Sequence, residues 1–409
     1  MSNFHRTVMQ QYVPPDELLE KYARILVQFA LNSGKGVKKG EVVQCIVPDV
    51  AKPLAFHLQN VILESGAHPL IKLLPTGFDR MFYSLASDSQ LSFYPEAFLR
   101  ERANLIDHTI GIIGDVDPSE LSATDPAKIM LARNSKKPYR DLLTDKESNG
   151  KYTWTIALWG TEAKAKIVGL SLEDYWKQII QACFLDSQNP IAEWKSLFSL
   201  QNKIKQSLNK ISIEKVHMVG EDVDLHIQLG VNRIWNGGSG RNIPSFELFT
   251  SPDWRGTEGW IQFNQPVYRY GSVIEGARLE FKKGLVTNAT ATQGEKLLKE
   301  MLKTQNADKL GEFSLTDARM SRITHPMAET LFDENVGGPF GNTHVAIGMS
   351  YRDCFRGDPA KVSKKEWEKM GFNDSAEHTD IVSTSDRVVT ATLTDGSTRV
   401  IYKDGTFQI

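Results

Sequence analysis

The amino-acid sequence predicts an α/β N-terminal domain with a parallel sheet, followed by a mainly antiparallel β domain of the α+β class. Up to about residue 210, short β-branched runs alternate with segments of helical periodicity, which is the pattern of βαβ units. Beyond Lys210, period-two alternation and Asp-Gly turns recur, as they do in antiparallel hairpins. The 409-residue length also favours two domains, because one domain averages roughly 100 to 200 residues.

The first half is expected to be doubly wound. A helix over residues 16–31 follows a start signal of two prolines and Asp16. A strand, a helix ended by Gly66 and a second strand then form a βαβ unit, whose strands are parallel and whose crossover is right-handed. We expect strands at 42–47, 69–74, 108–114 and 153–160, and helices at 50–65, 126–134, 171–184 and 190–209.

Neither a GxGxxG nor a GxxxxGKS motif follows any of these strands. The glycine-rich run at 34–40 precedes a strand, so it is interpreted as an ordinary loop rather than a phosphate site. Polar residues flank the strand at 108–114, where solvation and turn formation account for them, with a functional site as the less favoured alternative. These residues are Asp107, His108, Asp115 and Asp117.

The second half is expected to contain short strands and one helix, at 294–305. The segments KVHMVG and VDLHIQLG form two β segments joined at Glu221 and Asp222, and a turn-rich passage follows at 235–242. Asp-Gly pairs at 395–396 and 404–405 mark hairpin turns. We therefore expect one domain over 1–210 and another over 211–409.

Composition excludes or disfavours several classes of protein. The net charge is −2 and no dense basic block occurs, so a nucleic-acid partner is not expected. The cysteines Cys45, Cys183 and Cys354 are far apart and odd in number, which favours a reducing compartment over disulfides. The first residues lack the pattern of a secretory signal, and no apolar run approaches about 20 residues. We expect a cytoplasmic protein with no membrane partner.

The stretch DENVGGPFGNTHVAIGMSY, from Asp333 to Tyr351, places metal-binding side chains around a Gly/Pro loop. Its candidates are Asp333, Glu334 and His344. Adjacent residues point in different directions, so at most one of the two acids is expected to face a common site. We choose Glu334.

Further candidates lie on either side of this stretch. Glu247 occurs in PSFELFT and Glu312 in LGEFSL. His378 and Asp380 form an HxD pair that shares one face of an extended strand. Each of these side chains alone is compatible with an ordinary strand or turn position.

Together the candidates offer four carboxylates, two imidazoles and no sulfur, a donor set that suits Zn²⁺, Mn²⁺ or Co²⁺. Four clustered carboxylates repel one another unless they are compensated, and two divalent cations would balance them. We therefore hypothesise two divalent metal ions bound by Glu247, Glu312, Glu334, His344, His378 and Asp380.

Several segments, in this order, resemble those of the thermophilic-type metallo-aminopeptidase family. They are NIPSFELFTSPDWRGTEGW (242–260), LEFKKGLV (279–286), LGEFSL (310–315), LFDENVGGPFGNTHVAIGMSY (331–351) and HTDIV (378–382). The resemblance implies an N-terminal α/β domain, a C-terminal metal-binding catalytic domain and a homodimer. It also implies that the substrates are peptides with a free N-terminus, cut one residue at a time.

The resemblance assigns a role to each matching residue. Glu247 would bind one metal, and Glu312 would be the carboxylate shared by both metals. Glu334, His344, His378 and Asp380 would be the remaining ligands, across a GGPFG loop that is longer here than in the family's usual motif. Tyr351 corresponds to a catalytic tyrosine that can donate to the oxyanion. Glu312 is also a candidate general base, a role that competes with bridging two metals.

Two other functions remain open from the sequence. Another dinuclear hydrolase, such as a phosphoesterase, would bring cationic clamps to the metal segments, where only Arg241, Arg255 and Arg352 are near. A non-enzymatic binding protein would carry the same acids on its surface. Near Glu247, four charged residues are candidates for lining a substrate cleft, although a solvated loop explains them as well: Arg241, Asp253, Arg255 and Glu258.

Overall fold

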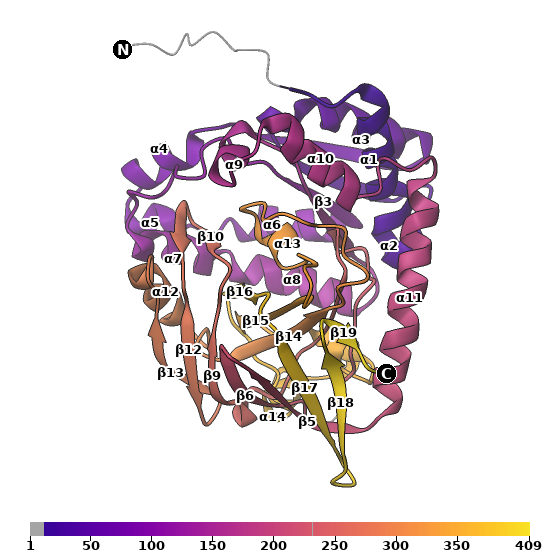
Figure 1. Cartoon of the computed structure of the whole chain (residues 1–409). Helices are drawn as coiled ribbons and strands as arrows, with labels where there is room; N and C mark the ends of the chain where they lie inside the picture. The colour runs from indigo at the N-terminus through magenta and orange to yellow at the C-terminus, as the bar shows by residue number, and fades with distance from the viewer. Residues whose placement is uncertain (1–11, 231) are drawn as a thin grey trace.

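A computed structural model describes residues 12–230 and 232–409. In Figure 1 the helices of the first half lie above and behind the strands of the second half, with the long helix α11 along one side. The predicted combination of a parallel sheet with antiparallel β sheets is confirmed. Within the described residues, no helix is both long and apolar enough to cross a bilayer.

The parallel sheet has the strand order β2-β1-β3-β4-β7. All four strands expected in the first half are present, and their pairing is parallel throughout. The fifth strand, β7, is a two-residue segment from the second half that pairs with β4. The strands are β1 (Val42–Pro48), β2 (His68–Leu74), β3 (His108–Ile113), β4 (Thr153–Leu158) and β7 (Asn242–Ile243). The chain therefore returns to the first sheet just before it supplies the site described below.

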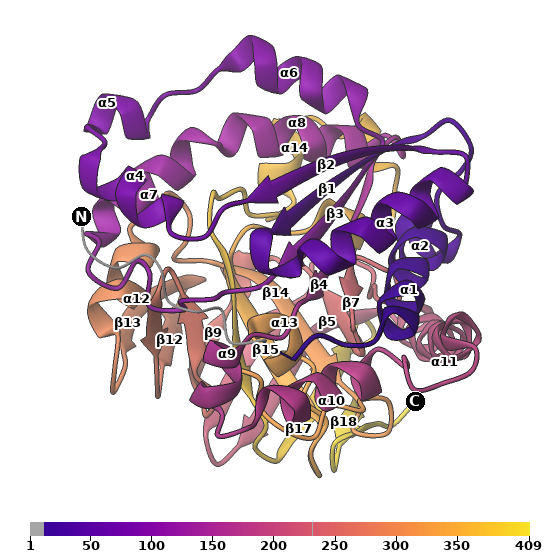
Figure 2. The same ribbon diagram turned by 90° about the horizontal axis from the view of Figure 1, so that it is seen from above.

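The expected helices of the first half are also present, and Figure 2 shows them on both faces of the parallel sheet. The helix expected over 16–31 continues from α1 through the π-helical turn η1 and ends in α2, where Asn32 and Ser33 have positive φ. The sequence pattern did not predict α4, α5, α6, α8 and α9. The helices are α1 (Asp16–Ile25), η1 (Leu26–Ala30), α2 (Leu31–Gly34), α3 (Lys52–Glu64), α4 (Phe78–Leu85), α5 (Asp88–Leu91), α6 (Glu96–Leu105), α7 (Pro126–Ser135), α8 (Lys137–Ser148), α9 (Glu162–Ile167), α10 (Leu172–Ala182) and α11 (Pro190–Lys210).

The second half contains an eight-stranded sheet, β13-β12-β9-β6-β5-β17-β18-β19, a four-stranded sheet, β16-β15-β14-β8, and the hairpin β10-β11. The predicted hairpin at Glu221 and Asp222 joins β5 to β6. The strands are β5 (Ile213–Gly220), β6 (Val223–Gln228), β8 (Glu247–Thr250), β9 (Glu258–Gln262), β10 (Val267–Arg269), β11 (Ser272–Ile274), β12 (Arg278–Lys282), β13 (Leu285–Thr290), β14 (Leu310–Thr316), β15 (Asn342–Gly348), β16 (His378–Ser383), β17 (Arg387–Leu393), β18 (Thr398–Lys403) and β19 (Thr406–Phe407).

The expected helix at 294–305 is α12, and two shorter helices, α13 and α14, add to it. The helices of this half are α12 (Glu295–Leu302), α13 (Thr330–Asp333) and α14 (Lys364–Lys369), and it has short 3-10 turns at Trp254–Gly256, Arg352–Cys354 and Pro359–Lys361. One further 3-10 turn, Asp49–Ala51, lies in the first half. The four-stranded sheet lies inside the molecule, and both β14 and β15 are buried along their whole length. Polar side chains on these two strands therefore need partners within the protein.

Candidate metal centre

The four-stranded sheet brings five of the six candidate ligands together on one of its faces, and Glu334 follows the end of α13. Side chains alternate between the faces of a strand, so Glu312 and Ser314 on β14 share a face. Across the sheet, Glu312 is opposite Ala346, and Ala346 is opposite Asp380. His344 enters the same face from its position opposite Ser314.

The adjacent acids Asp333 and Glu334 point to different partners. The carboxylate of Asp333 accepts hydrogen bonds from the backbone N–H of Met327 (2.6 Å) and of Glu329 (2.9 Å), which holds it against its own loop. Glu334 instead accepts from Asn242 Nδ2 at 3.0 Å and lines a small cavity with the other candidate ligands. Glu334 is thus the acid of the pair that faces the site.

His344 lies at the centre of the cluster. Its Nε2 is 3.1 Å from Glu247 Oε2 and 3.3 Å from Glu312 Oε1. Asp380 Oδ1 lies 4.0 Å from the same nitrogen. All six candidate residues therefore line one cavity, together with Tyr351.

His378 approaches the cluster from the other side. Its Nε2 is 3.4 Å from Asp380 Oδ1 and 3.6 Å from Glu312 Oε2. The two oxygens of Glu312 thus face different imidazoles, one towards His344 and the other towards His378. This arrangement makes Glu312 common to two groups of potential ligand atoms.

The acids of the cluster are difficult to ionise together. Burial raises the pKa of Glu312 to about 7, assisted by the nearby charges of Glu247 and Asp380 and opposed by the hydrogen bond to His344. Burial also raises the pKa of Glu334 well above its usual range, and Asp380 and Glu247 add to this effect. Like charges in a buried site favour the neutral form in this way.

The pKa values of the two imidazoles and of Asp380 are shifted so that the charged forms are favoured. Burial works to lower the pKa of His378, but Asp380 outweighs it and raises that pKa to about 9. The pKa of His344 also lies well above its usual value, because its hydrogen bonds to Glu247 and Glu312 outweigh burial. For Asp380, burial is outweighed by His378, so its pKa is lowered. Protonated imidazoles therefore supply positive charge to the cluster in the absence of other cations.

Contacts behind the cluster fix two of its members. His378 Nδ1 lies 2.9 Å from the carbonyl oxygen of Met349, so an N–H there leaves Nε2 directed at the carboxylates. Ser314 Oγ donates to Glu247 Oε2 at 3.0 Å. Ser314 was not among the residues predicted from the sequence, although its position two residues after Glu312 places it on the same strand face. The carbonyl of Met349 leaves no signal in the sequence.

Tyr351 packs against the cluster, with its ring centroid 4.9 Å from that of His378. The guanidinium of Arg241 lies 5.2 Å from the centroid of the Tyr351 ring. Burial raises the pKa of Tyr351 well above its usual value, and the charges of Glu312 and Asp380 add to this. The phenol is therefore a proton-carrying hydrogen-bond donor at neutral pH.

Arg241 is already neutralised by two acids. Its Nη2 lies 3.0 Å from Glu147 Oε1, and its Nη1 lies 2.7 Å from Asp353 Oδ2. Burial works to lower the pKa of Arg241, but Asp353 and Glu147 outweigh it and raise that pKa. Arg241 and Tyr351 also border a cavity of about 500 Å³ that lies between α8, β4, the loop at 236–241 and the loop after β15. This larger cavity shares its wall with the cavity that holds the cluster.

The donor set fits divalent cations. Two groups of ligand atoms, each within 4.8 Å of one another, are formed by Glu247, Glu312 and His344 and by Glu312, His378 and Asp380. Within residues 12–230 and 232–409, no Lys or Arg nitrogen comes within 4.0 Å of the four carboxylates. The carboxylates thus outnumber the imidazoles, their only positive partners within that distance among the described residues, and added positive charge would stabilise them.

The alternative candidates from the sequence lie elsewhere. Asp107 accepts from the N–H of Val42, and His108 contacts Thr153 and Glu41, so both join strands of the parallel sheet. Asp115 pairs with Lys164, and Asp117 pairs with Arg80. Asp253 pairs with Arg255, and Glu258 accepts from the N–H of Lys283. Of the charged cleft candidates, Arg241 lines the cavities beside the cluster.

Comparison with known proteins agrees with this architecture. Aminopeptidase PepS from Streptococcus thermophilus is 26% identical over 418 residues, covering 96% of this chain and 98% of that protein. Aminopeptidase T from Thermus aquaticus is 27% identical, covering 92% of this chain and 95% of that protein. The solved structure of wild-type AmpT from Thermus thermophilus superposes with a TM-score of 0.81 at 24% identity, covering 96% and 99% of the two chains, and so shares the fold.

The family model described as thermophilic metalloprotease (M29) matches residues 15–407, nearly the whole chain. That range includes both halves of the molecule and every residue of the buried cluster. This chain therefore belongs to the thermophilic metalloprotease (M29) family.

Proposed function

We propose that this protein is a metal-dependent aminopeptidase that releases N-terminal amino acids from peptides. Its family is that of a metalloprotease, and relatives across nearly its whole length carry the name aminopeptidase. The observation that carries the proposal is the buried cluster, in which Glu312 belongs to two groups of potential metal ligands.

Two divalent ions, Zn²⁺, Co²⁺ or Mn²⁺, would be bound in the cluster. Glu247 and His344 would hold one, His378 and Asp380 the other, and Glu312 both. Glu334 borders the same cavity and completes the set of six ligands. Bound divalent cations would supply Lewis acidity, which lowers the pKa of a nucleophilic water and polarises the peptide carbonyl.

Glu312 and Tyr351 are the residues proposed to act in catalysis. Glu312 has a pKa raised to about 7 before any cation binds, so its carboxylate can exchange a proton near neutral pH. Bridging two cations would compete with this role, because it engages both oxygens. The Tyr351 hydroxyl keeps its proton and would donate a hydrogen bond to the oxyanion that forms on the substrate.

The cavity of about 500 Å³ beside the cluster is the proposed peptide site. We assign residues 1–210 and 211–409 as the two domains, and the cavity takes lining residues from both, including Trp154 on one side and Tyr351 on the other. A substrate placed there would reach the cluster past Arg241, which lines both cavities.

The phosphoesterase alternative is disfavoured by the state of the nearby arginines. Arg241 is paired with Glu147 and Asp353. Arg255 is paired with Asp253, and Arg352 with Asp145. Cations that are already neutralised make poor clamps for a phosphoryl group.

The test is hydrolysis of an aminoacyl anilide by the purified protein, with and without a chelator. Cleavage that is lost on chelation, restored by Zn²⁺, Co²⁺ or Mn²⁺, and absent with the N-acetylated substrate supports the aminopeptidase. Inertness towards the anilide together with metal-dependent phosphoester cleavage supports the phosphoesterase. Absence of both activities supports a non-enzymatic binding protein.

We also propose a homodimer formed through the edge of the parallel sheet. Strand β2 is an edge strand, and such an edge can pair with a second copy. Exposed apolar side chains lie on β2, on the helices after it and in the connection between α5 and α6, and these helices run along the outer side of the molecule in Figure 2. They are Leu70, Leu73, Leu74, Phe78, Met81, Phe82, Leu85, Phe93 and Phe98. Light scattering of wild type and of Leu70→Glu tests this, since the variant should be monomeric.

A reducing, cytoplasmic location is proposed on the state of the cysteines. Cys45, Cys183 and Cys354 are buried free thiols, each in a different part of the fold. Burial raises the pKa of the first two to about 12, which leaves them as unreactive thiols. Labelling of the native protein with a thiol reagent should therefore be slow and should become complete only on unfolding.

A further inference from the structure

The hairpin β5-β6 carries a second group of metal-binding side chains, in a different sheet from the cluster described above. His217 on β5 is directly opposite His226 on β6, and Asp224 precedes His226 by two residues on the same strand. The three side chains therefore share one face of the hairpin. Leu225, between Asp224 and His226, and Met218, directly opposite Leu225, are buried on the other face.

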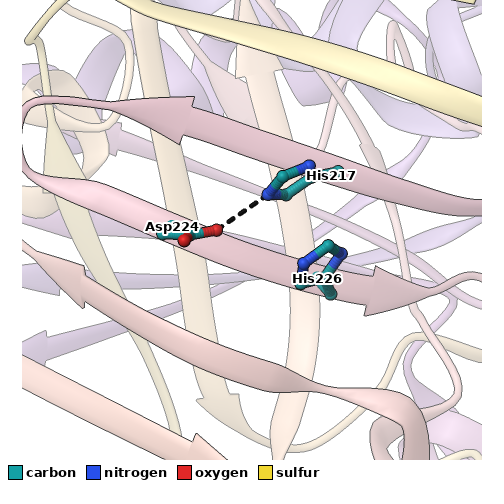
Figure 3. Close-up of side chains that lie close together, drawn as sticks. All are labelled: His217, Asp224 and His226. Atoms are coloured by element: carbon teal, nitrogen blue, oxygen red, sulfur yellow. Dashed lines mark hydrogen bonds and ion pairs between the residues drawn. The ribbon is translucent and has the colours of Figure 1, made fainter.

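The three side chains are already close together, as Figure 3 shows. His217 Nε2 lies 2.7 Å from Asp224 Oδ1. The two imidazole rings stack with their centroids 3.8 Å apart and their planes within 13°. One potential ligand atom from each residue lies within 4.8 Å of the other two.

We propose that His217, Asp224 and His226 form an additional binding site for a borderline divalent transition ion, of which Zn²⁺ is the representative. Two imidazoles and one carboxylate match the ligand preference of such ions, whereas Mg²⁺ and Ca²⁺ prefer oxygen ligands. Three protein ligands leave further coordination positions for water. The site is open to solvent, because the side chains of His217 and Asp224 are 38% and 58% exposed.

An ordinary surface ion pair explains less of this arrangement. It accounts for the contact between Asp224 and His217 but not for the stacking of His226 on His217. Among the residues that the structure describes, neither ring nitrogen of His226 has a hydrogen-bond partner. A metal ion would use the free electron pairs of both rings and the carboxylate together, and it would join β5 to β6 through their side chains.

The test is a count of bound Zn²⁺ in the full-length protein. Wild type and His226→Gln are stripped with a chelator, equilibrated with Zn²⁺ and analysed for zinc per subunit, with calorimetric titration alongside. We expect the variant to bind one Zn²⁺ fewer, or to bind it at least about tenfold more weakly, with unchanged peptidase activity. The difference of one ion is expected whatever number the buried cluster takes, so the result is independent of the proposed function.

A matched pair of variants separates ligation from charge. Asp224→Asn and Glu258→Gln each remove one negative charge on the same sheet, and Glu258 lies opposite His226 on β9 with its carboxylate held by the N–H of Lys283 at 2.6 Å. Only Asp224→Asn should weaken the additional Zn²⁺ site.

A spectroscopic measurement gives a second, direct readout. With the buried cluster loaded with Zn²⁺, one equivalent of Cu²⁺ should give an electron paramagnetic resonance spectrum with coupling to imidazole nitrogens, and that coupling should be lost in His226→Gln. Equal Zn²⁺ stoichiometry and affinity in wild type and His226→Gln, or a Cu²⁺ spectrum that the substitution leaves unchanged, would overturn the proposal.

Discussion

Two buried glutamates, Glu312 and Glu377, lie in the same region of the molecule and differ in how their charge is balanced. Both are almost fully shielded from solvent, with 4% and 0% exposure respectively. Glu377 faces Arg133 Nε at 3.4 Å and Arg269 Nη2 at 3.8 Å. It also accepts from Tyr270 Oη at 3.0 Å. Its pKa is lowered, because these arginines outweigh the effect of burial.

Glu312 has no arginine partner among the described residues, and the negative charges of other acids lie close to it instead. Burial raises its pKa to about 7, and Glu247 and Asp380 contribute to the rise. An acid neutralised by arginines, such as Glu377, serves the structure, since its ion pair with Arg133 joins the segment just before β16 to α7. An acid with an excess of negative neighbours indicates a place where a cation belongs. The comparison therefore separates a structural charge cluster from a ligand site without reference to any bound ion.

The largest expected effect that tests this comparison is the loss of activity in Glu312→Gln. The amide cannot bridge two cations or accept a proton, so kcat/KM should fall by about 100- to 10,000-fold. Steady-state cleavage of an aminoacyl anilide measures the effect. Glu377→Gln, which replaces an equally buried acid, is the matched control and should retain most of its turnover once folded. Activity of Glu312→Gln within a few-fold of wild type would remove Glu312 from both proposed roles.

Glu377→Gln should instead reduce stability. The substitution leaves Arg133 and Arg269 beside a neutral group, and breaking a buried ion pair from one side is strongly destabilising. Because both arginines are partly exposed, we expect a loss of about 2 kcal/mol or more in the free energy of unfolding. Urea denaturation of the metal-loaded protein measures it. An unchanged unfolding midpoint would show that the ion pairs of Glu377 contribute nothing net.

Tyr351→Phe tests whether the site extends beyond the charged cluster. The ring should still pack on His378, but the donor to the oxyanion is gone, so kcat should fall by about 100- to 1,000-fold. Metal content and KM should stay close to those of wild type. An unchanged kcat would leave Tyr351 a packing residue only, whereas a loss of metal would place it among the groups that hold the cluster together.

The sequence predicted that His378 and Asp380 share one face of a strand, but it did not predict which buried acids are paired with arginines. In the segment EHTD, period-two alternation puts His378 and Asp380 on one face and Glu377 on the other, and the structure has this arrangement. The arginines that neutralise Glu377 come from α7 and β10, far away along the chain. Which acid is balanced and which is not therefore depends on long-range packing that local patterns do not contain.

The failure to predict one of the helices, α8, has a related explanation. Helix α8 is largely polar, with no fully buried residue, so it lacks the apolar spacing on which the helix prediction depends. Yet it supplies Glu147, which pairs with Arg241 beside Tyr351. The wall of the proposed peptide site thus includes an element that the sequence pattern did not reveal. The strands were found because each is a short apolar or β-branched run, a pattern that predicts a strand from its own residues.

The smallest expected effect concerns the contact behind Glu247. Ser314 Oγ donates to Glu247 Oε2 at 3.0 Å, and Ser314 is itself fully buried. In Ser314→Ala this oxygen loses its donor and the carboxylate is oriented less firmly, so metal affinity should fall by about tenfold while turnover of the fully loaded protein stays near that of wild type. Competition with a metal-binding dye measures the affinity. The matched control is Thr250→Val, on the adjacent strand. It removes a buried hydroxyl that donates to the Ile234 carbonyl, and it should leave metal affinity unchanged. Equal affinity in Ser314→Ala and wild type would mean that Glu247 is positioned by the sheet alone, and that the contrast with Glu377 lies only in the balance of charge.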